Sequence, residues 1–449
     1  MRSTLRAVSA ALIIASPVGC SAQQSSAGRL LDENALREYA GIYQWSSDSF
    51  VYLQPWAELT GKNQLVAFDE SGDVRTLFPT DRDRFFAGPA AADSSAVQSR
   101  IEFHRDSSGK ISALIWRREG DTARVAQRLD IEKREDLNFV NGDVKLAGTL
   151  TIPRTGGKHP AIILVHASGA EDRDYLLPFA HFLVRRGFAI LGYDKRGVGG
   201  STGNWRTASF NDLAGDVVAA FEYLKSRPDI DAARIGLLGW SQAGWVMPIA
   251  AVRVPGMAFI ISISGAAIPT EQTTIDQAHN ELLARGMKPE TVDDITNLMK
   301  LQYQFARTGQ GWEDYAAARE RIAARLGQPP EQFPAKRDDP HWDLIRRQYI
   351  YDPTPTLHQL RVPMLGLFGE LDNNILAAKN AAAWDSALKT AGNTDYTLRI
   401  LPKANHLMLE AKVGNNAEMP SLQRFVPSYY TTVREWLAMR IPTSQGAVE

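Results

Sequence analysis

Three residues of types that take part in nucleophilic catalysis occupy comparable places in the chain. Each follows a short apolar run: Ser241 comes after residues 235–238, Asp372 after 364–368, and His406 after 396–401. A serine activated by a histidine base, itself oriented by a carboxylate, attacks carbonyl carbons. Taken singly, each residue has an ordinary structural interpretation, because serine and aspartate are common in turns and histidine in loops. Their shared position after a strand favours one common site.

The stretch 234–244, RIGLLGWSQAG, predicts a sharp turn from a strand into a helix, with Ser241 at its apex. Such a turn lifts the serine hydroxyl above the sheet and is called a nucleophile elbow. Small residues at Gly239 and Ala243 let the strand and the helix pass closely. The strict pattern Gly-x-Ser-x-Gly has glycine where this chain has Ala243, and Gly244 follows. The alternative is a serine in an ordinary strand–helix turn.

Two further strand ends carry polar residues. The first runs into 166–169, His-Ala-Ser-Gly, and the second into 193–197, Tyr-Asp-Lys-Arg-Gly. Neither is a phosphate-binding loop, since no Gly-Lys-Ser/Thr closes the glycine run. We interpret the turn at 167–169 as one that presents a backbone N–H to an oxyanion, with His166 bracing it. Asp194 and Arg196 are interpreted as residues that tie loops together, because structural ion pairs also gather at strand ends.

The elements that position these residues alternate between strand and helix. An Asn-Gly hairpin at 139–144 is followed by strands at 144–152, 161–165, 188–191, 235–238 and 259–263, with helices expected at 175–186 and from the Ser209–Asp212 capping box onward. This order predicts a mostly parallel sheet covered on both faces. Sites on such sheets lie at the carboxyl ends of the strands, where Ser241 is expected.

After residue 265 the pattern changes to amphipathic helices, expected near 271–285, 290–308 and 313–326. Gly286, Gly309 and Gly327 fall at their ends. A Pro-rich loop at 328–340 follows, and strands resume at 364–368 and 396–401. Residues 268–355 are therefore expected to form a helical insertion over the strand ends.

These motifs together resemble the α/β-hydrolase superfamily over about residues 135–440, and most of all bacterial carboxylesterases related to the dienelactone-hydrolase and prolyl-oligopeptidase catalytic domains. The resemblance rests on 165–169 with 171–174, on 193–197, on the elbow, on 369–372 and on Asn405-His406. The order Ser, Asp, His is also that of the superfamily. The expected fold class is α/β: a mostly parallel, doubly wound sheet with a helical cap at about 268–355 and a small N-terminal all-β domain.

The resemblance implies a role for each site residue. Ser241 attacks the carbonyl, His406 accepts and returns its proton, and Asp372 orients the imidazole. The backbone N–H groups of Gln242 and Ser168 bind the oxyanion. The expected activity is hydrolysis of small carboxylic esters through an acyl-enzyme, with neither metal nor cofactor. A peptidase or thioesterase of the same fold is the alternative, and a non-catalytic exported binding protein is the alternative from another class.

Two positions depart from the family pattern. Ala167 stands where the family usually has glycine, and Trp240 stands where it often has histidine. The indole of Trp240 is expected beside the nucleophile, so Trp240 and His166 are candidates for the wall of the substrate pocket.

Residues 30–130 contain short strand-like runs separated by turn signals and predict a small β-sandwich or barrel. The run resembles the lipocalin-like β domain appended to some bacterial serine hydrolases, from 39–43 through 83–86 to 103–106. Substrate gating or docking and simple packing are the two alternatives for its role.

The amino terminus, residues 1–22, has the layout of a secretory signal: Arg2 and Arg6, then an apolar core, then small residues. Cys20, the only cysteine, follows Val18-Gly19 as in a bacterial lipobox, although Pro17 stands where that pattern prefers leucine. Lipidation of Cys20 and ordinary cleavage after Ala22 are both open. Either predicts an exported protein in the periplasm or cell envelope.

Composition sets the remaining limits. The 449 residues include 44% hydrophobic and 22% charged residues, and the net charge is −1. This composition is ordinary for a soluble globular protein and gives no basic face for nucleic acid. One cysteine builds neither a disulfide framework nor a cysteine-based metal site. The oligomeric state does not follow from these features.

Overall fold

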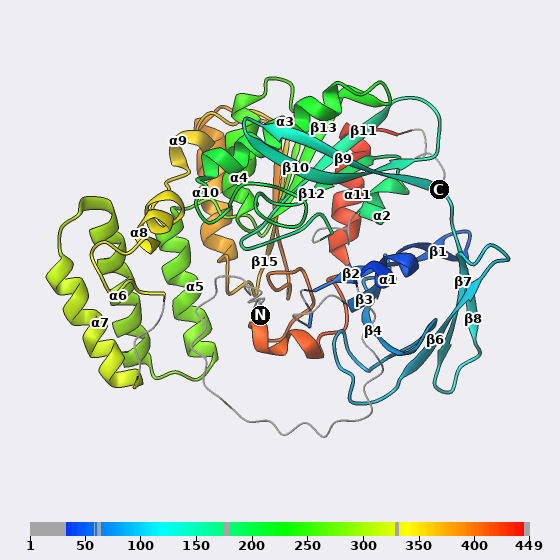
Figure 1. Cartoon of the computed structure of the whole chain (residues 1–449), viewed down its shortest axis with the longest axis horizontal. Helices are drawn as coiled ribbons and strands as arrows, with labels where there is room; N and C mark the ends of the chain where they lie inside the picture. The colour runs from blue at the N-terminus through cyan, green and yellow to red at the C-terminus, as the bar shows by residue number, and fades with distance from the viewer. Residues whose placement is uncertain (1–32, 58, 61–63, 175–179, 328–331, 444–449) are drawn as a thin grey trace.

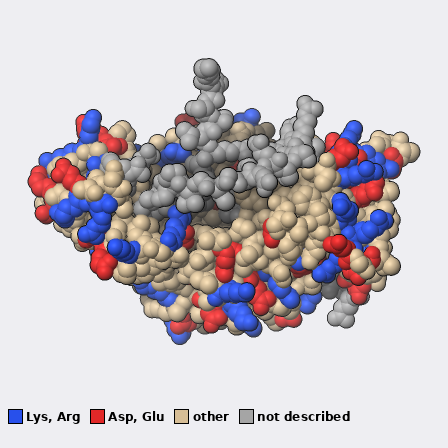
Figure 2. All heavy atoms as spheres, turned by 90° about the horizontal axis from the view of Figure 1, so that it is seen from below, with Lys and Arg blue, Asp and Glu red and all other residues tan. Residues whose placement is uncertain are grey.

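The computed structural model describes residues 33–57, 59–60, 64–174, 180–327 and 332–443. The leader predicted at 1–22, with Cys20, lies outside the described residues. Figure 1 shows a β-barrel in blue and cyan at the lower right, an α/β domain above it, and a lobe of helices at the left. No described helix is both long enough and apolar enough to cross a membrane. On the face seen from below, acidic and basic side chains are interspersed over both ends (Figure 2).

The N-terminal unit begins with helix α1 (Glu33–Tyr39) and continues as a closed antiparallel barrel. Pairing of Tyr43 with Arg128 joins the first strand to the last and closes it. Alternate residues such as Leu53, Leu65 and Leu114 fill the interior. The strands that the sequence did not indicate are β4, β5 and β8. The eight strands are β1 (Gly41–Ser46), β2 (Ser49–Trp56), β3 (Gln64–Phe68), β4 (Val74–Asp81), β5 (Arg84–Ala87), β6 (Ser99–Arg105), β7 (Ile111–Arg118) and β8 (Arg124–Arg128).

The second unit is built on an eight-stranded sheet with the order β16-β15-β14-β13-β11-β12-β10-β9. The pairs β9–β10 and β10–β12 are antiparallel, and the remaining neighbours are parallel. The predicted α/β fold class is therefore confirmed. Its strands are β9 (Glu132–Asn141), β10 (Val144–Pro153), β11 (His159–Val165), β12 (Ala189–Tyr193), β13 (Ile230–Trp240), β14 (Ile260–Ile263), β15 (Met364–Gly369) and β16 (Tyr396–Leu401).

Helices cover both faces of this sheet. On one face, α3 (Phe210–Lys225), α4 (Ala243–Arg253) and α10 (Ala377–Thr390) pack over a core that includes Trp245 and Trp384. On the other, α2 (Ala180–Val184) and α11 (Ser428–Arg440) pack over a core that includes Trp240 and Tyr429. The predicted capping box opens α3, because Ser209 and Asp212 bond each other's backbone N–H. Of the helix predicted at 175–186, residues 175–179 lie outside the described part.

The helical insertion predicted after residue 265 follows β14 and forms a lobe of helices. Its long helices are α5 (Thr270–Ala284), α6 (Pro289–Thr308) and α7 (Trp312–Leu326), close to the predicted ranges. They enclose a core of their own around Leu298, Tyr315 and Trp342. Short elements complete the lobe and the chain: α8 (His341–Leu344), the π-helical turn η2 (Ile345–Tyr349), α9 (Thr354–Leu357) and the 3₁₀ helix η3 (Asn416–Ser421).

The barrel and the α/β domain share one hydrophobic core. The outward faces of β1 to β4, with residues such as Ile42, Tyr52 and Val66, pack with Phe425 and Tyr430 from the α/β domain. Backbone bonds add to this contact, because the Phe425 N–H donates to Gly72 (2.7 Å) and the Val74 N–H to Gln423 (3.2 Å). The barrel is therefore fixed against the domain that carries the candidate site.

Candidate active site

Ser241 stands at the turn between β13 and α4, where the sequence predicts it. Its φ is +54°, a left-handed conformation that a serine rarely adopts. The turn is held by its own backbone: the Ser241 N–H donates to Ile263 (3.1 Å), and the Gly244 N–H donates to the Ser241 carbonyl (2.9 Å). Strain of this kind persists only where the surrounding structure determines it, and it gathers at functional sites.

The short distance between β13 and α4 explains why alanine is tolerated at position 243 of the elbow motif. A Cβ at Gly239 would lie 2.5 Å from the Ala243 Cβ and 2.8 Å from the Val165 carbonyl oxygen. Gly244 has the same requirement, because its Cβ would meet the Ala266 backbone nitrogen at 2.5 Å. One methyl group therefore fits between the strand and the helix, and Ala243 supplies it.

Asp372 and His406 are brought together at the ends of β15 and β16. The His406 Nδ1 and the Asp372 Oδ2 are 2.8 Å apart, and the aspartate side chain is fully buried. The other carboxylate oxygen, Oδ1, accepts from the N–H groups of Asn374 and Ile375, both at 2.8 Å. With both oxygens engaged, the carboxylate has a fixed orientation and directs Nδ1 of the imidazole.

The loop that carries His406 is hydrogen-bonded to the end of β14, the strand that also bonds the elbow. Ser264 follows Ile263, whose carbonyl accepts from Ser241, and the Ser264 hydroxyl donates to the His406 carbonyl (3.0 Å). Ser264 also has a positive φ, 46°. Ser241, Asp372 and His406 thus lie at one edge of the sheet, joined through the end of β14.

Asn405 is a supporting residue that the sequence assigned no role of its own. Its side chain is buried, and its Oδ1 accepts from the N–H groups of Leu407 (3.0 Å) and Leu409 (2.9 Å). The Asn405 N–H in turn donates to the Leu409 carbonyl (3.0 Å). This side chain therefore closes the loop that presents His406. The only sequence signal was its place directly before the histidine.

The two predicted oxyanion residues are linked by a buried lysine that sequence reasoning missed. The Lys195 ammonium donates to the Ala167 carbonyl (2.7 Å), next to Ser168, and to the Gln242 Oε1 (3.1 Å). Gln242 stands before α4, where N–H groups have no intrahelical acceptor, and Gly169 closes the other turn with φ +104°. Burial lowers the pKa of Lys195 to about 8, although the carboxylates of Glu171 and Asp216 oppose it.

The two residues proposed for the pocket wall are both buried. His166 bonds the Tyr193 carbonyl through Nε2 (2.6 Å), as expected of a brace, and burial together with Lys195 lowers its pKa to about 3. It borders a cavity of only about 10 Å³ beside Lys195 and Gln242. Trp240 packs edge-on against Tyr429, with ring centroids 6.3 Å apart. The structure therefore places both side chains in packed surroundings beside the elbow.

The loop-tying role expected of Asp194 and Arg196 is what the structure shows. Asp194 accepts from the Arg173 side chain (2.8 and 3.0 Å) and from the Gly200 N–H (2.7 Å). Arg196 makes two bonds to Asp216, at 2.7 and 2.8 Å. The first pair joins the loop after β11 to the loop after β12, and the second ties the loop after β12 to α3.

Comparison with known families places this site within a matched region. A sequence model of the X-Pro dipeptidyl-peptidase (S15) family matches residues 141–408, more than half of the chain and a range that contains Ser241, Asp372 and His406. The chain belongs to the X-Pro dipeptidyl-peptidase (S15) family. The S15 match begins after the barrel, at the end of β9, and includes the helical lobe.

Individual relatives of this S15 chain include esterases. It is 27% identical over 333 residues to the esterase EstD of Thermotoga maritima, and the alignment covers 71% of each protein. It is 26% identical over 219 residues to the bifunctional esterase/perhydrolase DCH of Acinetobacter calcoaceticus, over 47% of this chain and 74% of that one. Among solved structures, the Pyrococcus furiosus esterase Pf2001 matches with 17% identity and a TM-score of 0.43, over 69% of this chain and 92% of that one.

Proposed function

We propose that the protein is a serine hydrolase that cleaves carboxylic esters. The observation that carries the proposal is the His406–Asp372 pair at 2.8 Å, held at the same sheet edge as a serine with φ +54° at a strand–helix turn. A fixed histidine–carboxylate pair beside a strained, partly exposed serine is the arrangement needed to activate a hydroxyl nucleophile.

The proposed reaction has two halves. The Ser241 oxygen bonds to the ester carbonyl carbon while His406 takes the hydroxyl proton, and the C–O bond to the alcohol breaks as His406 returns that proton to it. Water then attacks the acyl-serine in the same way and releases the acid. The N–H groups of Gln242 and Ser168 stabilise the negative oxygen in both halves, and Lys195 holds the two turns that carry them.

The relatives support two different leaving groups. EstD and DCH are named as esterases, which favours an alcohol leaving group. The family description names an X-Pro dipeptidyl-peptidase, which favours an amine and is the reason to keep the peptidase alternative. A thioesterase would use the same chemistry. We favour the ester because EstD, which is named as an esterase, aligns with this chain over 333 residues.

The hydroxyl of Ser241 should be indispensable for hydrolysis. Ser241→Ala should lower turnover of p-nitrophenyl acetate and butyrate by about four to six orders of magnitude, because loss of a triad nucleophile leaves only binding and oxyanion stabilisation. Ser226→Ala, at the end of α3, is the matched control with unchanged turnover. Undiminished hydrolysis by Ser241→Ala would refute the assignment.

Two further readouts separate the alternatives. If the wild-type protein cleaves Ala-Pro-p-nitroanilide with a higher kcat/KM than the esters, it is a peptidase. If an acyl thioester gives the highest kcat/KM, it is a thioesterase. A fluorophosphonate probe labels the serine of an active hydrolase. Failure of the probe to label wild-type protein, together with no turnover of any of these substrates, would favour the non-catalytic binding protein.

A further inference from the structure

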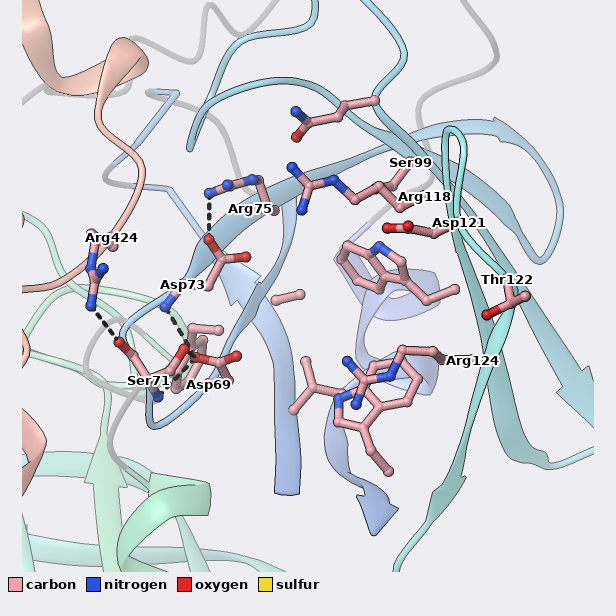
Figure 3. A pocket seen from close by; sticks show the side chains of 16 residues that line it. Asp69, Ser71, Asp73, Arg75, Ser99, Arg118, Asp121, Thr122, Arg124 and Arg424 are labelled. Carbon is pink, nitrogen blue, oxygen red and sulfur yellow. Dashed lines mark hydrogen bonds and ion pairs between the residues drawn. The ribbon is translucent and has the colours of Figure 1, made fainter. Parts of the chain in front are cut away.

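The barrel encloses a cavity of about 420 Å³ at one end of its interior. Figure 3 shows Arg75, Arg118 and Arg124 entering this space from β4, β7 and β8. A closed eight-stranded barrel is wide enough either to be filled by side chains or to hold one small molecule. Cavities of this volume are typical of small-molecule sites. We call this cavity the barrel pocket.

The strand register shows how the pocket arises. One layer across β6, β7 and β8 contains Phe103, Leu114 and Ala126, which are buried in the barrel core. The next layer toward the pocket contains Ile101, Trp116 and Arg124, and the one after it pairs Ser99 with Arg118. Because side chains alternate along a strand, Trp116, Arg118 and Arg124 share the inward side with that core. The inward side of β7 and β8 thus changes from apolar to basic toward this end.

Two of the pocket arginines, Arg118 and Arg124, form no close ion pair within the described part of the chain, although Arg118 acts electrostatically on Asp73, which lines the same pocket. No ion pair within 4.0 Å forms at Arg118 or Arg124, and both side chains reach solvent. Arg105, toward the other end of the barrel, instead bonds Asp83 with two nitrogens and pairs with Glu38. Guanidinium groups left without an acceptor are suited to bind an anion, and a carboxylate matches their planar geometry.

The remaining charges of the pocket are occupied. Arg75 pairs with Asp73 (2.9 Å) and donates to the Gln423 carbonyl (2.7 Å), while Arg424 donates to the Ser71 carbonyl (3.1 Å). Asp69 accepts from the Ser71 N–H (2.9 Å) and the Asp73 N–H (3.0 Å) of its own turn. These residues form the wall next to the α/β domain. On the opposite wall, the single carboxylate of Asp121 does not balance the two charges of Arg118 and Arg124, so that wall is net positive.

Two tryptophans line the same cavity. Trp45 and Trp116 are only half-buried and meet edge to face, with centroids 6.5 Å apart and planes at 79°. Arg124 lies 4.6 Å above the Trp45 ring, which orients this guanidinium and leaves its edge for an acceptor. Half-exposed indoles in a concave site offer apolar contact to an aromatic ring.

We propose that the barrel pocket binds a small aromatic carboxylate, with its ring against Trp45 and Trp116 and its carboxylate on Arg118 and Arg124. The guanidinium groups of Arg118 and Arg124 favour an anion over a cation, the two indoles favour a ring over an aliphatic chain, and the volume of about 420 Å³ admits one such molecule. This site is separate from Ser241, because every pocket residue except Arg424 belongs to the barrel or its loops.

Isothermal titration calorimetry of the whole protein with 2-naphthoate tests the proposal. We expect one site per chain, and binding at least about tenfold weaker for the isosteric neutral 2-naphthamide, because only the anion bonds the guanidinium groups. Acetate, which has the charge without the ring, should bind more weakly than 2-naphthoate. Equal affinity for naphthoate and naphthamide, or no heat with naphthoate at millimolar concentration, would overturn the proposal.

Variants locate the site. Arg118→Gln and Arg124→Gln should each weaken naphthoate binding about tenfold or more, and Trp116→Leu should weaken naphthoate more than acetate. Arg117→Gln is the matched control, because Arg117 is the exposed neighbour on β7 that does not line the pocket. Melting temperatures establish that the variants are folded. Naphthoate binding that survives both arginine substitutions, or that is lost equally in Arg117→Gln, would place the ligand elsewhere and contradict the assignment.

Discussion

At the scale of single residues, the candidate site is held in place by groups outside the proposed triad. Lys195 is the clearest case, since one ammonium bonds the turn before Ser168 and the side chain of Gln242. The carboxylates of Glu171 and Asp216 favour the charged form of Lys195. His166 beside it is neutral because its pKa is about 3, and the centroid of the Trp205 ring lies 5.6 Å from the ammonium. Its positive charge therefore lies against both turns whose N–H groups are proposed to bind the oxyanion.

The charge on Lys195 predicts an alkaline limb in the activity profile. The ammonium is present below a pKa of about 8, so kcat/KM for a stable ester should fall as pH rises through that value. Lys195→Met should lack this limb and should have a plateau about ten- to a hundredfold lower below pH 8, since it removes charged hydrogen bonds. The surface variant Lys225→Met should keep the wild-type profile. An identical alkaline limb in Lys195→Met would exclude Lys195 as its source.

At the scale of elements, the close contact between β13 and α4 fixes the position of Ser241. Gly239→Ala should lower the free energy of unfolding by about 1–3 kcal/mol and lower kcat, because its methyl group overlaps Ala243 and the Val165 carbonyl. Ala243→Gly, the matched control, removes a methyl and should cost about 1 kcal/mol at most. The double variant should recover part of the loss, since the contact with Val165 remains. Wild-type stability and kcat in Gly239→Ala would contradict this account of the elbow.

The same elements show what the sequence predicts and where it stops. The elbow, the capping box at Ser209 and the three long cap helices were predictable, because each depends on local spacing of small, capping or apolar residues. Lys195 was not predictable, because its partners are 28 and 47 positions away in the chain. β8 was also missed. The residues on the inward side of this strand are Arg124, Ala126 and Arg128, and charged residues are not expected inside a barrel. Such residues reveal their role only when the barrel has closed around them.

At the scale of the whole molecule, the barrel is held to the α/β domain by charge as well as by the shared core. Glu70, at the turn after β3, pairs with Arg185 and Arg186 beyond α2, both at 2.5 Å, and accepts from the Tyr52 hydroxyl. Burial opposes ionisation of Glu70, but the two guanidinium groups outweigh it and lower its pKa to about 2. The Phe425 segment next to this contact also pairs with Leu409 of the His406 loop. The barrel is thereby connected to the histidine end of the site.

The lowered pKa of Glu70 predicts how the junction responds to acid. The pKa of Glu70 is about 2 in the folded protein and about 4.5 in the unfolded chain. Its charge therefore stabilises the folded state fully above pH 4.5, and this contribution is lost as the pH falls from 4.5 toward 2. Glu70→Gln should therefore lower the free energy of unfolding in urea by about 1–3 kcal/mol at pH 7, and the gap to wild type should narrow at pH 3. Glu102→Gln, which removes an exposed pair with Arg84 at 3.5 Å, should change little at either pH. A Glu70→Gln gap that stays constant or widens on acidification would show that the charge of Glu70 does not stabilise the junction.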